Sequence, residues 1–240
     1  MEKLKTYFNW SSGKDSALAL YYLLQDEKYA VDELITTINN HYNRVSMHGL
    51  RKELLIAQTK AINIPASLIE LPEMPSIEIY EQKMLETVSR LKKEGFTHSA
   101  FGDIFLEDLK LYREKQLEKK GMKAVFPIWK RDTKELLNEF LDLGFKTIIV
   151  CANFKYFGEE FVGTVIDKHF IDNLPEGVDP CGENGEFHTF CFDGPIFKNS
   201  IPFTIGEKVY REYDAPKTDD SVCKNDDEKY GVWYCDLIPK

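Results

Sequence analysis

The chain lacks any hydrophobic run near the roughly 20 residues that a membrane-spanning helix requires. It also lacks the basic and then apolar start of a signal peptide between Met1 and Trp10. Basic residues are in deficit, because 31 Lys and Arg against 40 Asp and Glu give a net charge of −9. Such a field repels the phosphate backbone of nucleic acids. We therefore expect a cytoplasmic protein that binds neither membrane nor nucleic acid.

Cysteine is scarce, and its five positions show no C-x-x-C spacing. An odd number of scattered cysteines suits reduced thiols in a reducing compartment better than a disulfide framework, and it does not support a zinc site. The cysteines are Cys151, Cys181, Cys191, Cys223 and Cys235.

The pattern that is present belongs to a globular α/β protein. Of 240 residues, 43% are hydrophobic, and over the first 150 or so residues short β-type runs alternate with helical patterns. This alternation predicts a parallel sheet sandwiched by helices, as in Rossmann-like folds. After about Phe170, prolines and glycines interrupt short aromatic and β-branched runs, which indicates a smaller β-rich region. We predict domains at 1–170 and 171–240. The expected strands of the sheet are 6–10, 32–39, 66–71, 98–101, 124–126 and 147–151.

Three helices have distinct sequence patterns. The segment 16–24 is apolar on nearly every side, which is typical of a helix pressed into the interior. After Ser76, apolar residues from Ile77 to Leu91 recur every three or four positions and predict a helix with one face on the sheet. Asp132 with Glu135 three residues later predicts a capped helix start.

The segment from Trp10 to Ser16 joins the first strand to the first helix. Free backbone N–H groups and the positive end of the helix dipole meet at such a junction, which predicts a phosphate site. Small residues let the backbone approach an anion, Lys14 offers a positive charge, and hydroxyl groups offer hydrogen bonds. Asp15 is expected either to help hold Mg²⁺ or to fix the loop. The predicted nucleotide-binding residues here are Ser11, Ser12, Gly13, Lys14, Asp15 and Ser16.

Two further groups of polar residues follow. Gly102 and Asp103 come after the fourth expected strand, at the carboxyl edge where open α/β sheets bind ligands, so Asp103 is expected near the phosphates. Arg113 on the next helix either contacts a phosphate or carboxylate or forms a surface ion pair with Glu114 or Glu118. His41 and His48 flank a turn after the second expected strand. They either line a pocket for adenine or substrate, or have capping or surface roles.

The glycine-rich segment 179–189 carries Glu183, Glu186 and His188. Carboxylates here are suited to position an amine or accept its proton, and the imidazole is suited to act as a base near neutral pH. The alternative is a hairpin with two solvated glutamates and a hydrogen-bonded histidine.

The first loop resembles the PP-loop, S-G-G-x-D-S, of the N-type ATP pyrophosphatases, which are similar in fold to the adenine nucleotide alpha hydrolases. Ser12 replaces the first glycine of that pattern. If the position needs a left-handed backbone, a residue other than glycine costs roughly 1 to 2 kcal/mol. Across nearly the whole chain, the combined segments resemble the diphthine-ammonia ligases, or ATP-binding diphthamide synthases. The segments that carry this resemblance are 11–16, 102–104 with Glu107, Asp108 and Arg113, 156–163 and 182–189.

The resemblance implies an AMP-forming ligase that uses ATP and Mg²⁺ to adenylate a carboxylate and then transfers ammonia to it. The implied acceptor is diphthine on elongation factor 2, or else a small-metabolite carboxylate, and a homodimer stays open. The implied catalytic residues are Asp103, Arg113, Glu183, Glu186 and His188, and Gly102 joins the nucleotide-binding loop. Two alternatives remain: a nucleotide-binding regulatory module that leaves ATP intact, and a tRNA-modifying PP-loop enzyme, against which the charge and cysteine pattern argue.

Overall fold

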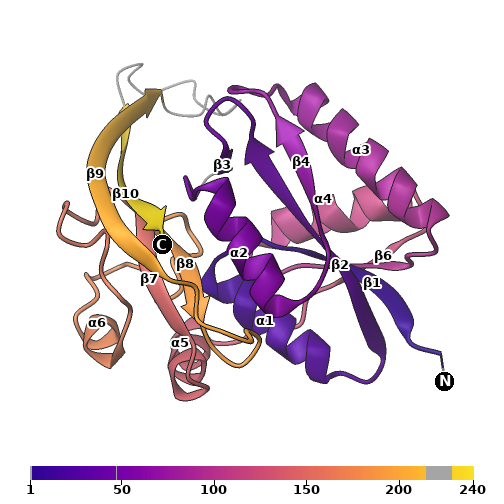
Figure 1. Cartoon of the computed structure of the whole chain (residues 1–240), viewed down its shortest axis with the longest axis horizontal. Helices are drawn as coiled ribbons and strands as arrows, with labels where there is room; N and C mark the ends of the chain where they lie inside the picture. Colours follow the sequence, from indigo (N-terminus) through magenta and orange to yellow (C-terminus); the bar gives the residue numbers. More distant parts are fainter. Residues whose placement is uncertain (1, 47, 215–228) are drawn as a thin grey trace.

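The computed structural model describes residues 2–46, 48–214 and 229–240, and Cys223 lies outside them. The chain forms two β-sheets with helices between and around them (Figure 1). No helix within the described ranges is long and apolar enough to cross a membrane.

The first sheet is largely parallel, in the order β4–β2–β1–β5–β6, and a short β3 pairs antiparallel with the end of β2. This confirms the predicted α/β class with a parallel sheet. The strands are β1 (Leu4–Asn9), β2 (Tyr29–Asn39), β3 (Arg44–Val45), β4 (Ala66–Leu71), β5 (His98–Ala100) and β6 (Lys123–Val125).

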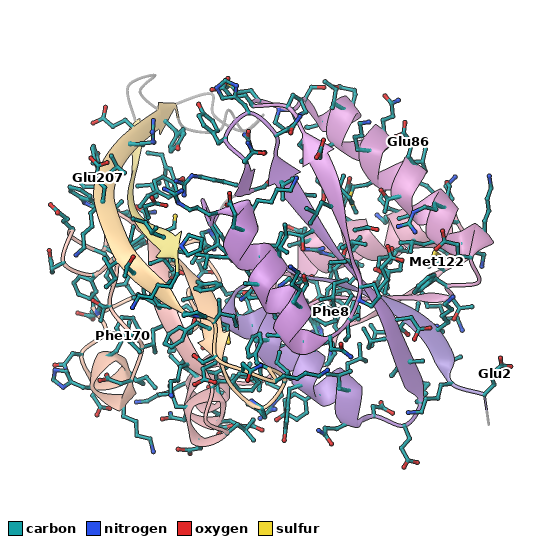
Figure 2. The ribbon with its side chains drawn as sticks, viewed as in Figure 1. Glu2, Phe8, Glu86, Met122, Phe170 and Glu207 are labelled. Carbon is teal, nitrogen blue, oxygen red and sulfur yellow. The ribbon has the colours of Figure 1, made fainter. Side chains whose placement is uncertain are left out.

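Helices cover both faces of this sheet. Neighbouring strand residues alternate between two apolar cores, because side chains along a strand point to opposite faces. Phe8 packs on the side of α1 and α2, whereas Tyr7 packs with Val88 and Leu117 on the side of α3 and α4. Figure 2 shows Phe8 inside the fold and Glu86 on its outer surface. The helices are α1 (Lys14–Gln25), α2 (Lys52–Ile62), α3 (Ile77–Lys93) and α4 (Glu107–Glu118).

Helix α1 lies between the two sheets, which explains its apolar sequence. Its core residues, including Leu18, Leu20 and Leu23, are almost completely buried, and they belong to the same core as Phe190 of the second sheet. A helix enclosed on two sides has no face left for water. The prediction of an interior helix over 16–24 is therefore confirmed.

The two capped helices begin where the sequence predicts. The side chain of Ser76 accepts from the amide of Ile79 at the start of α3, and that of Asp132 accepts from the amide of Glu135 at the start of α5 (Thr133–Asp142). The expected apolar face of α3 needs one correction. Ile77 is 74% exposed, because the first turn of α3 extends beyond the sheet, and burial of this face is completed only at its far end.

The second sheet is antiparallel and has the order β8–β7–β10–β9. Placing the segment 147–151 in the parallel sheet was wrong, because it forms β7 of this second sheet. Its core is apolar on both faces, so its sequence suits a central strand of either sheet. The division after residue 170 stays a prediction, since strand pairing alone defines no domain boundary. The elements of this region are β7 (Lys146–Asn153), α6 (Lys168–Asp172), β8 (Phe187–Asp193), β9 (Phe203–Asp214) and β10 (Lys229–Pro239).

A branched ion pair ties the second sheet to the first near β3. The guanidinium of Arg44 lies 2.9 Å from one carboxylate oxygen of Asp236 on β10, and that of Arg51 lies 2.6 Å from the other. Both oxygens are thus paired with cations from the first sheet's side. The second region is held close to the carboxyl ends of the parallel strands.

Candidate functional site

The candidate site lies where the strand order of the parallel sheet reverses, beside β1. The chain leaves β1 toward β2 on one side, and β5 lies on the other side of β1. The loops that follow β1 and β5 therefore diverge and leave a crevice at their carboxyl ends, the place where open α/β sheets bind ligands. The first loop is the predicted phosphate loop, and the second carries Gly102 and Asp103.

A crevice of about 420 Å³ occupies this position. It is bordered by the ends of β1, β2 and β5, by α4, and by residues of the second region. Of the predicted site residues, those that line it are Ser11, Asp15, Ser16, Gly102, Asp103, Arg113, Glu183 and His188. Those that do not line it are Ser12, Gly13, Lys14 and Glu186. The structure thus brings together residues from three separate stretches of the chain: 11–16, 102–113 and 183–188.

The phosphate loop turns through a left-handed residue. Ser12 has a φ of 75°, which confirms the backbone conformation considered for this position, although a serine replaces glycine there. Hydroxyl groups close the loop: that of Ser11 donates to that of Ser16 at 3.0 Å, and the Gly13 amide donates to the Ser11 hydroxyl at 3.3 Å. The loop is ordered by its own side chains.

The start of α1 is capped from the second sheet. Gly13 occupies the N-cap position and has no side chain to accept a hydrogen bond. The hydroxyl oxygen of Thr189 on β8 accepts from the amide of Lys14 at 3.0 Å instead. This distant cap satisfies one of the amides that a helix start leaves unpaired.

The Lys14 side chain is buried beside the crevice and does not line it. It is 3% exposed and its ammonium group lies 2.8 Å from the Asp15 carboxylate. The ammonium also donates to the carbonyl of Cys181 and lies 5.1 Å from the centre of the Phe187 ring. Burial opposes the charged form, but Asp15, Cys181 and Glu183 together outweigh it and the pKa of Lys14 is raised. Its direct contact with phosphate stays a prediction, and in this structure its charge acts beside Asp15.

Gly102 allows the second loop to approach the start of α1. A β-carbon at this position would lie 2.9 Å from the amide nitrogen of Ser16 and 3.1 Å from the carbonyl carbon of Asp15. Both are backbone atoms that cannot swing aside. Only glycine allows the backbone at residue 102 to lie this close to the backbone of Asp15 and Ser16. This close approach brings Asp103 beside the phosphate loop.

Asp103 and Arg113 form an ion pair inside the crevice. Nε of Arg113 lies 2.9 Å from one oxygen of Asp103, and its terminal nitrogen donates to the other at 3.1 Å. The guanidinium also lies 4.3 Å from the centre of the Phe101 ring. Burial raises the pKa of Asp103, Arg113 counteracts this, and Asp15 adds to it. The expected surface pair with Glu114 or Glu118 is not what Arg113 makes here, because the pair points inward.

Glu183 reaches across from the second region. One of its carboxylate oxygens accepts from the backbone amide of Ile104 at 2.9 Å. Burial raises the pKa of Glu183 to about 7, with a further contribution from Asp15. A carboxyl group with this pKa can take up or release a proton near neutral pH.

Glu186 has a different setting from Glu183. It is 1% exposed, and its oxygens accept from the amides of Asp179 and Asn184 at 3.0 and 2.9 Å and from the Asn184 side chain at 3.1 Å. These contacts hold the loop that presents Glu183. The catalytic role predicted for Glu186 stays a prediction, and in this geometry it acts on the shape of the loop.

Two histidines stack at the crevice wall. The rings of His48 and His188 lie 4.8 Å apart at an angle of 22°, and a ring nitrogen of His48 lies 3.2 Å from the carbonyl oxygen of Thr189. Burial lowers the pKa of His48 to about 3 and that of His188 to about 4. Both rings are neutral at physiological pH, so they are available as acceptors. Of the two uses considered for His48, the pocket position is the one it has, whereas His41 is exposed.

The charge of the crevice suits a cation bound together with phosphates. Asp15, Asp103 and Glu183 all line it. The negative charge of Asp15 contributes to the raised pKa of both Asp103 and Glu183. Among the residues that the structure describes, no group of three or more His, Cys, Asp or Glu side chains forms a metal site by itself. Mg²⁺ is commonly held by one or two carboxylates together with substrate phosphates, and these residues fit that donor set.

Sequence patterns of two protein domains match the chain. The diphthamide synthase N-terminal domain matches residues 4–124, and the diphthamide synthase C-terminal domain matches residues 132–217. The chain belongs to the diphthamide synthase family.

Curated relatives carry the name diphthine–ammonia ligase. The zebrafish (Danio rerio) protein is 33% identical over 93 residues, which cover 37% of this chain and 36% of that protein. The mouse (Mus musculus) protein is 32% identical over 100 residues, covering 37% and 35%. The human protein is 26% identical over 129 residues, covering 52% and 48%. The chain thus matches about half or less of the length of these relatives.

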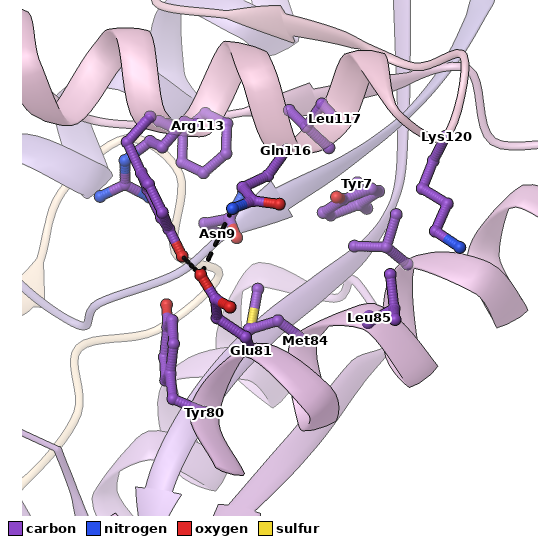
Figure 3. Close-up of a pocket in the computed structure, with 13 residues that line it drawn as sticks. Tyr7, Asn9, Tyr80, Glu81, Met84, Leu85, Arg113, Gln116, Leu117 and Lys120 are labelled. Atoms are coloured by element: carbon purple, nitrogen blue, oxygen red, sulfur yellow. Dashed lines mark hydrogen bonds between the residues drawn. The ribbon is translucent and has the colours of Figure 1, made fainter. Parts of the chain in front are cut away.

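A side pocket in this diphthamide synthase family member opens from the crevice between α3 and α4 (Figure 3). Its volume is about 80 Å³, and it shares Arg113, Tyr80 and Phe101 with the crevice. Glu81 of α3 lines it and accepts from the hydroxyl of Tyr112 at 2.9 Å. The side pocket and the crevice therefore adjoin at these shared residues.

One residue that contacts the phosphate loop was missed as a functional candidate: Gln58, which is buried on α2, a helix that the sequence did not predict. Thr189 lies in the predicted segment 179–189, but its contact with the start of α1, far away in the chain, was not predicted. A glutamine among the apolar positions of α2 was an available signal, because a buried amide requires partners.

Proposed function

We propose that this protein is an ATP-dependent amide ligase that releases AMP and pyrophosphate. The carboxylate of an acceptor attacks the α phosphorus of ATP, forming an acyl-adenylate. Ammonia then displaces AMP, forming the amide. The first step is needed because a carboxylate has no good leaving group until it carries AMP.

The phosphate loop is proposed to hold the β and γ phosphates. The hydroxyl groups of Ser11 and Ser16 line the crevice, next to the positive end of the α1 dipole. Mg²⁺, with Asp15 as one proposed ligand, would neutralise phosphate charge during the transfer.

Arg113 is proposed to stabilise the charge that develops at the α phosphorus. Its guanidinium is already oriented by Asp103 and by the Phe101 ring. A donor that is held in place before the reaction needs no reorganisation when charge develops, and such groups commonly supply much of the acceleration. Asp103 therefore acts by orienting Arg113.

The observation that carries the proposal is the position of Glu183. A carboxyl with a pKa of about 7 reaches from the second region into the crevice beside the phosphate loop. Ammonium is not a nucleophile until it loses a proton, and a base with this pKa accepts one near neutral pH. A module that only binds a nucleotide has no need of such a group. His188, as a neutral acceptor in the same crevice, is proposed to orient the amine.

Diphthine is the proposed acceptor, because the curated relatives are named for it. A small-metabolite carboxylate is the second candidate. The membership in the family supports the reaction class more strongly than the identity of the acceptor.

The test is to incubate the purified protein with ATP, Mg²⁺ and ammonium and to measure AMP, with and without diphthine-bearing elongation factor 2. We expect AMP and amide in equal amounts only when the acceptor is present. Glu183→Gln should lower amide formation by about 10²- to 10⁴-fold, the usual contribution of a general base. ATP that is bound but intact with every acceptor would refute the ligase and favour a regulatory module.

A further inference from the structure

The amide of Gln58 is buried against the phosphate loop. The side chain comes from α2 and is 0% exposed. Its oxygen accepts from the indole nitrogen of Trp10 at 3.1 Å, and its nitrogen donates to the carbonyl oxygens of Ser12 at 3.0 Å and Cys191 at 2.6 Å. The amide therefore joins three segments: α2, the loop after β1, and β8.

These contacts fall on the strained residue of the loop. Ser12 has a φ of 75°, a conformation that costs a non-glycine residue roughly 1 to 2 kcal/mol. Its carbonyl oxygen receives two hydrogen bonds, from Gln58 and from the amide of Cys191 at 2.9 Å. Two fixed donors on one carbonyl oppose rotation of the peptide between residues 12 and 13. The orientation of that peptide decides where the following amides of the loop point.

We infer that Gln58 is a positioning residue for phosphate binding, which holds the loop in its left-handed turn and attaches it to β8. The inference rests on the proposed function, because it takes the loop to be the phosphate site. Gln58 does not line the crevice, so it acts through its hydrogen-bond partners Trp10, Ser12 and Cys191. The hydrogen bond from Gln58 also explains how Ser12 keeps a left-handed backbone that glycine would adopt without strain.

A purely structural role for Gln58 makes a different prediction. Burying an amide costs free energy that an apolar side chain of similar volume avoids, so stability alone does not require glutamine at this position. If Gln58 only fills space, its loss changes stability and leaves ligand affinity in the folded protein unchanged. If it positions the loop, its loss weakens ligands that carry phosphates and spares a ligand that has none.

The experiment measures the binding of ATP with Mg²⁺, of inorganic pyrophosphate and of adenosine by calorimetry. The proteins are the wild type, Gln58→Leu, and Thr147→Val as the matched control. Thr147 is also fully buried and its hydroxyl donates to the Phe190 carbonyl of β8 at 3.0 Å, but it does not contact the loop. Gln58→Leu should weaken ATP and pyrophosphate by about tenfold, the effect expected of one or two lost buried hydrogen bonds. Adenosine should change by less than about twofold, and the control should bind all three as the wild type does.

A second variant covers the case in which Gln58→Leu does not fold. Gln58→Met keeps an unbranched side chain of similar length but cannot donate to the two carbonyls, and we expect the same selective loss. Unchanged ATP affinity in a folded Gln58 variant, or an equal loss for adenosine, would overturn the inference and leave the proposed function standing. A wild-type protein that binds neither ATP nor pyrophosphate would overturn both.

Discussion

Replacing Glu183 with Gln should change how the stability of the protein depends on pH. In the folded protein, burial and the nearby Asp15 charge raise the pKa of Glu183 from 4.5 to about 7. The unfolded chain exposes this group to water, where its pKa returns to the lower value. The folded state thus holds the proton more tightly, and the stability that this contributes is complete below pH 4.5 and is lost as the pH rises through 7. The amide of the Glu183→Gln variant does not titrate, so this dependence should be absent from it.

The size of the effect follows from the two pKa values. A change from 4.5 to about 7 corresponds to about 3 kcal/mol, at about 1.4 kcal/mol for each pKa unit. About a quarter of this is already lost at pH 5. Between pH 5 and pH 8, the wild type should therefore lose about 2 kcal/mol more than Glu183→Gln. The glutamine side chain can still accept from the Ile104 amide, so the loop contact is kept.

The assay is equilibrium unfolding in urea at a series of pH values, followed by circular dichroism. Glu176→Gln is the matched control, because it removes the same charge from an exposed position of the same region. The control should run parallel to the wild-type curve, whereas Glu183→Gln should gain about 2 kcal/mol relative to the wild type between pH 5 and pH 8. Parallel curves for the wild type and Glu183→Gln would refute the assignment of Glu183 as a group that titrates near neutral pH.

Three further substitutions test the geometry of the crevice. Gly102→Ala should lower the free energy of unfolding by about 1 to 3 kcal/mol and weaken ATP binding, because the added methyl group meets backbone at 2.9 Å; Gly158→Ala, which meets only the end of a flexible side chain, should change neither in calorimetry. Arg113→Lys should slow AMP release by about tenfold or more, since lysine cannot reproduce the two-point contact of the guanidinium, and an unchanged initial rate would contradict the role of Arg113. Thr189→Val should cost about 1 kcal/mol in urea unfolding through the lost cap on the Lys14 amide; equal stability would show that the cap contributes nothing.

Much of the fold could be predicted because its signals are local. The cap at Asp132 and the apolar repeat ending at Leu91 depend on residues a few positions apart, and the structure has both. The expected parallel strands before residue 130 also form, since short apolar runs between helical patterns indicate them. The assignment of β7 to the first sheet failed, because a strand that is apolar on both faces carries no mark of its partner.

The candidate site divides along the same line. The sequence by itself indicated that the Ser11–Ser16 loop and the Gly102–Asp103 turn follow strands at the edge of the sheet, because a strand end, small residues and a helix start are adjacent in the chain. Only the tertiary structure decided that Lys14 is buried against Asp15, that His48 lines the crevice, and that Gln58 donates to the Ser12 carbonyl. Each of these depends on contacts between segments far apart in the chain, and side-chain direction, burial and pKa arise only when the second sheet closes against the first.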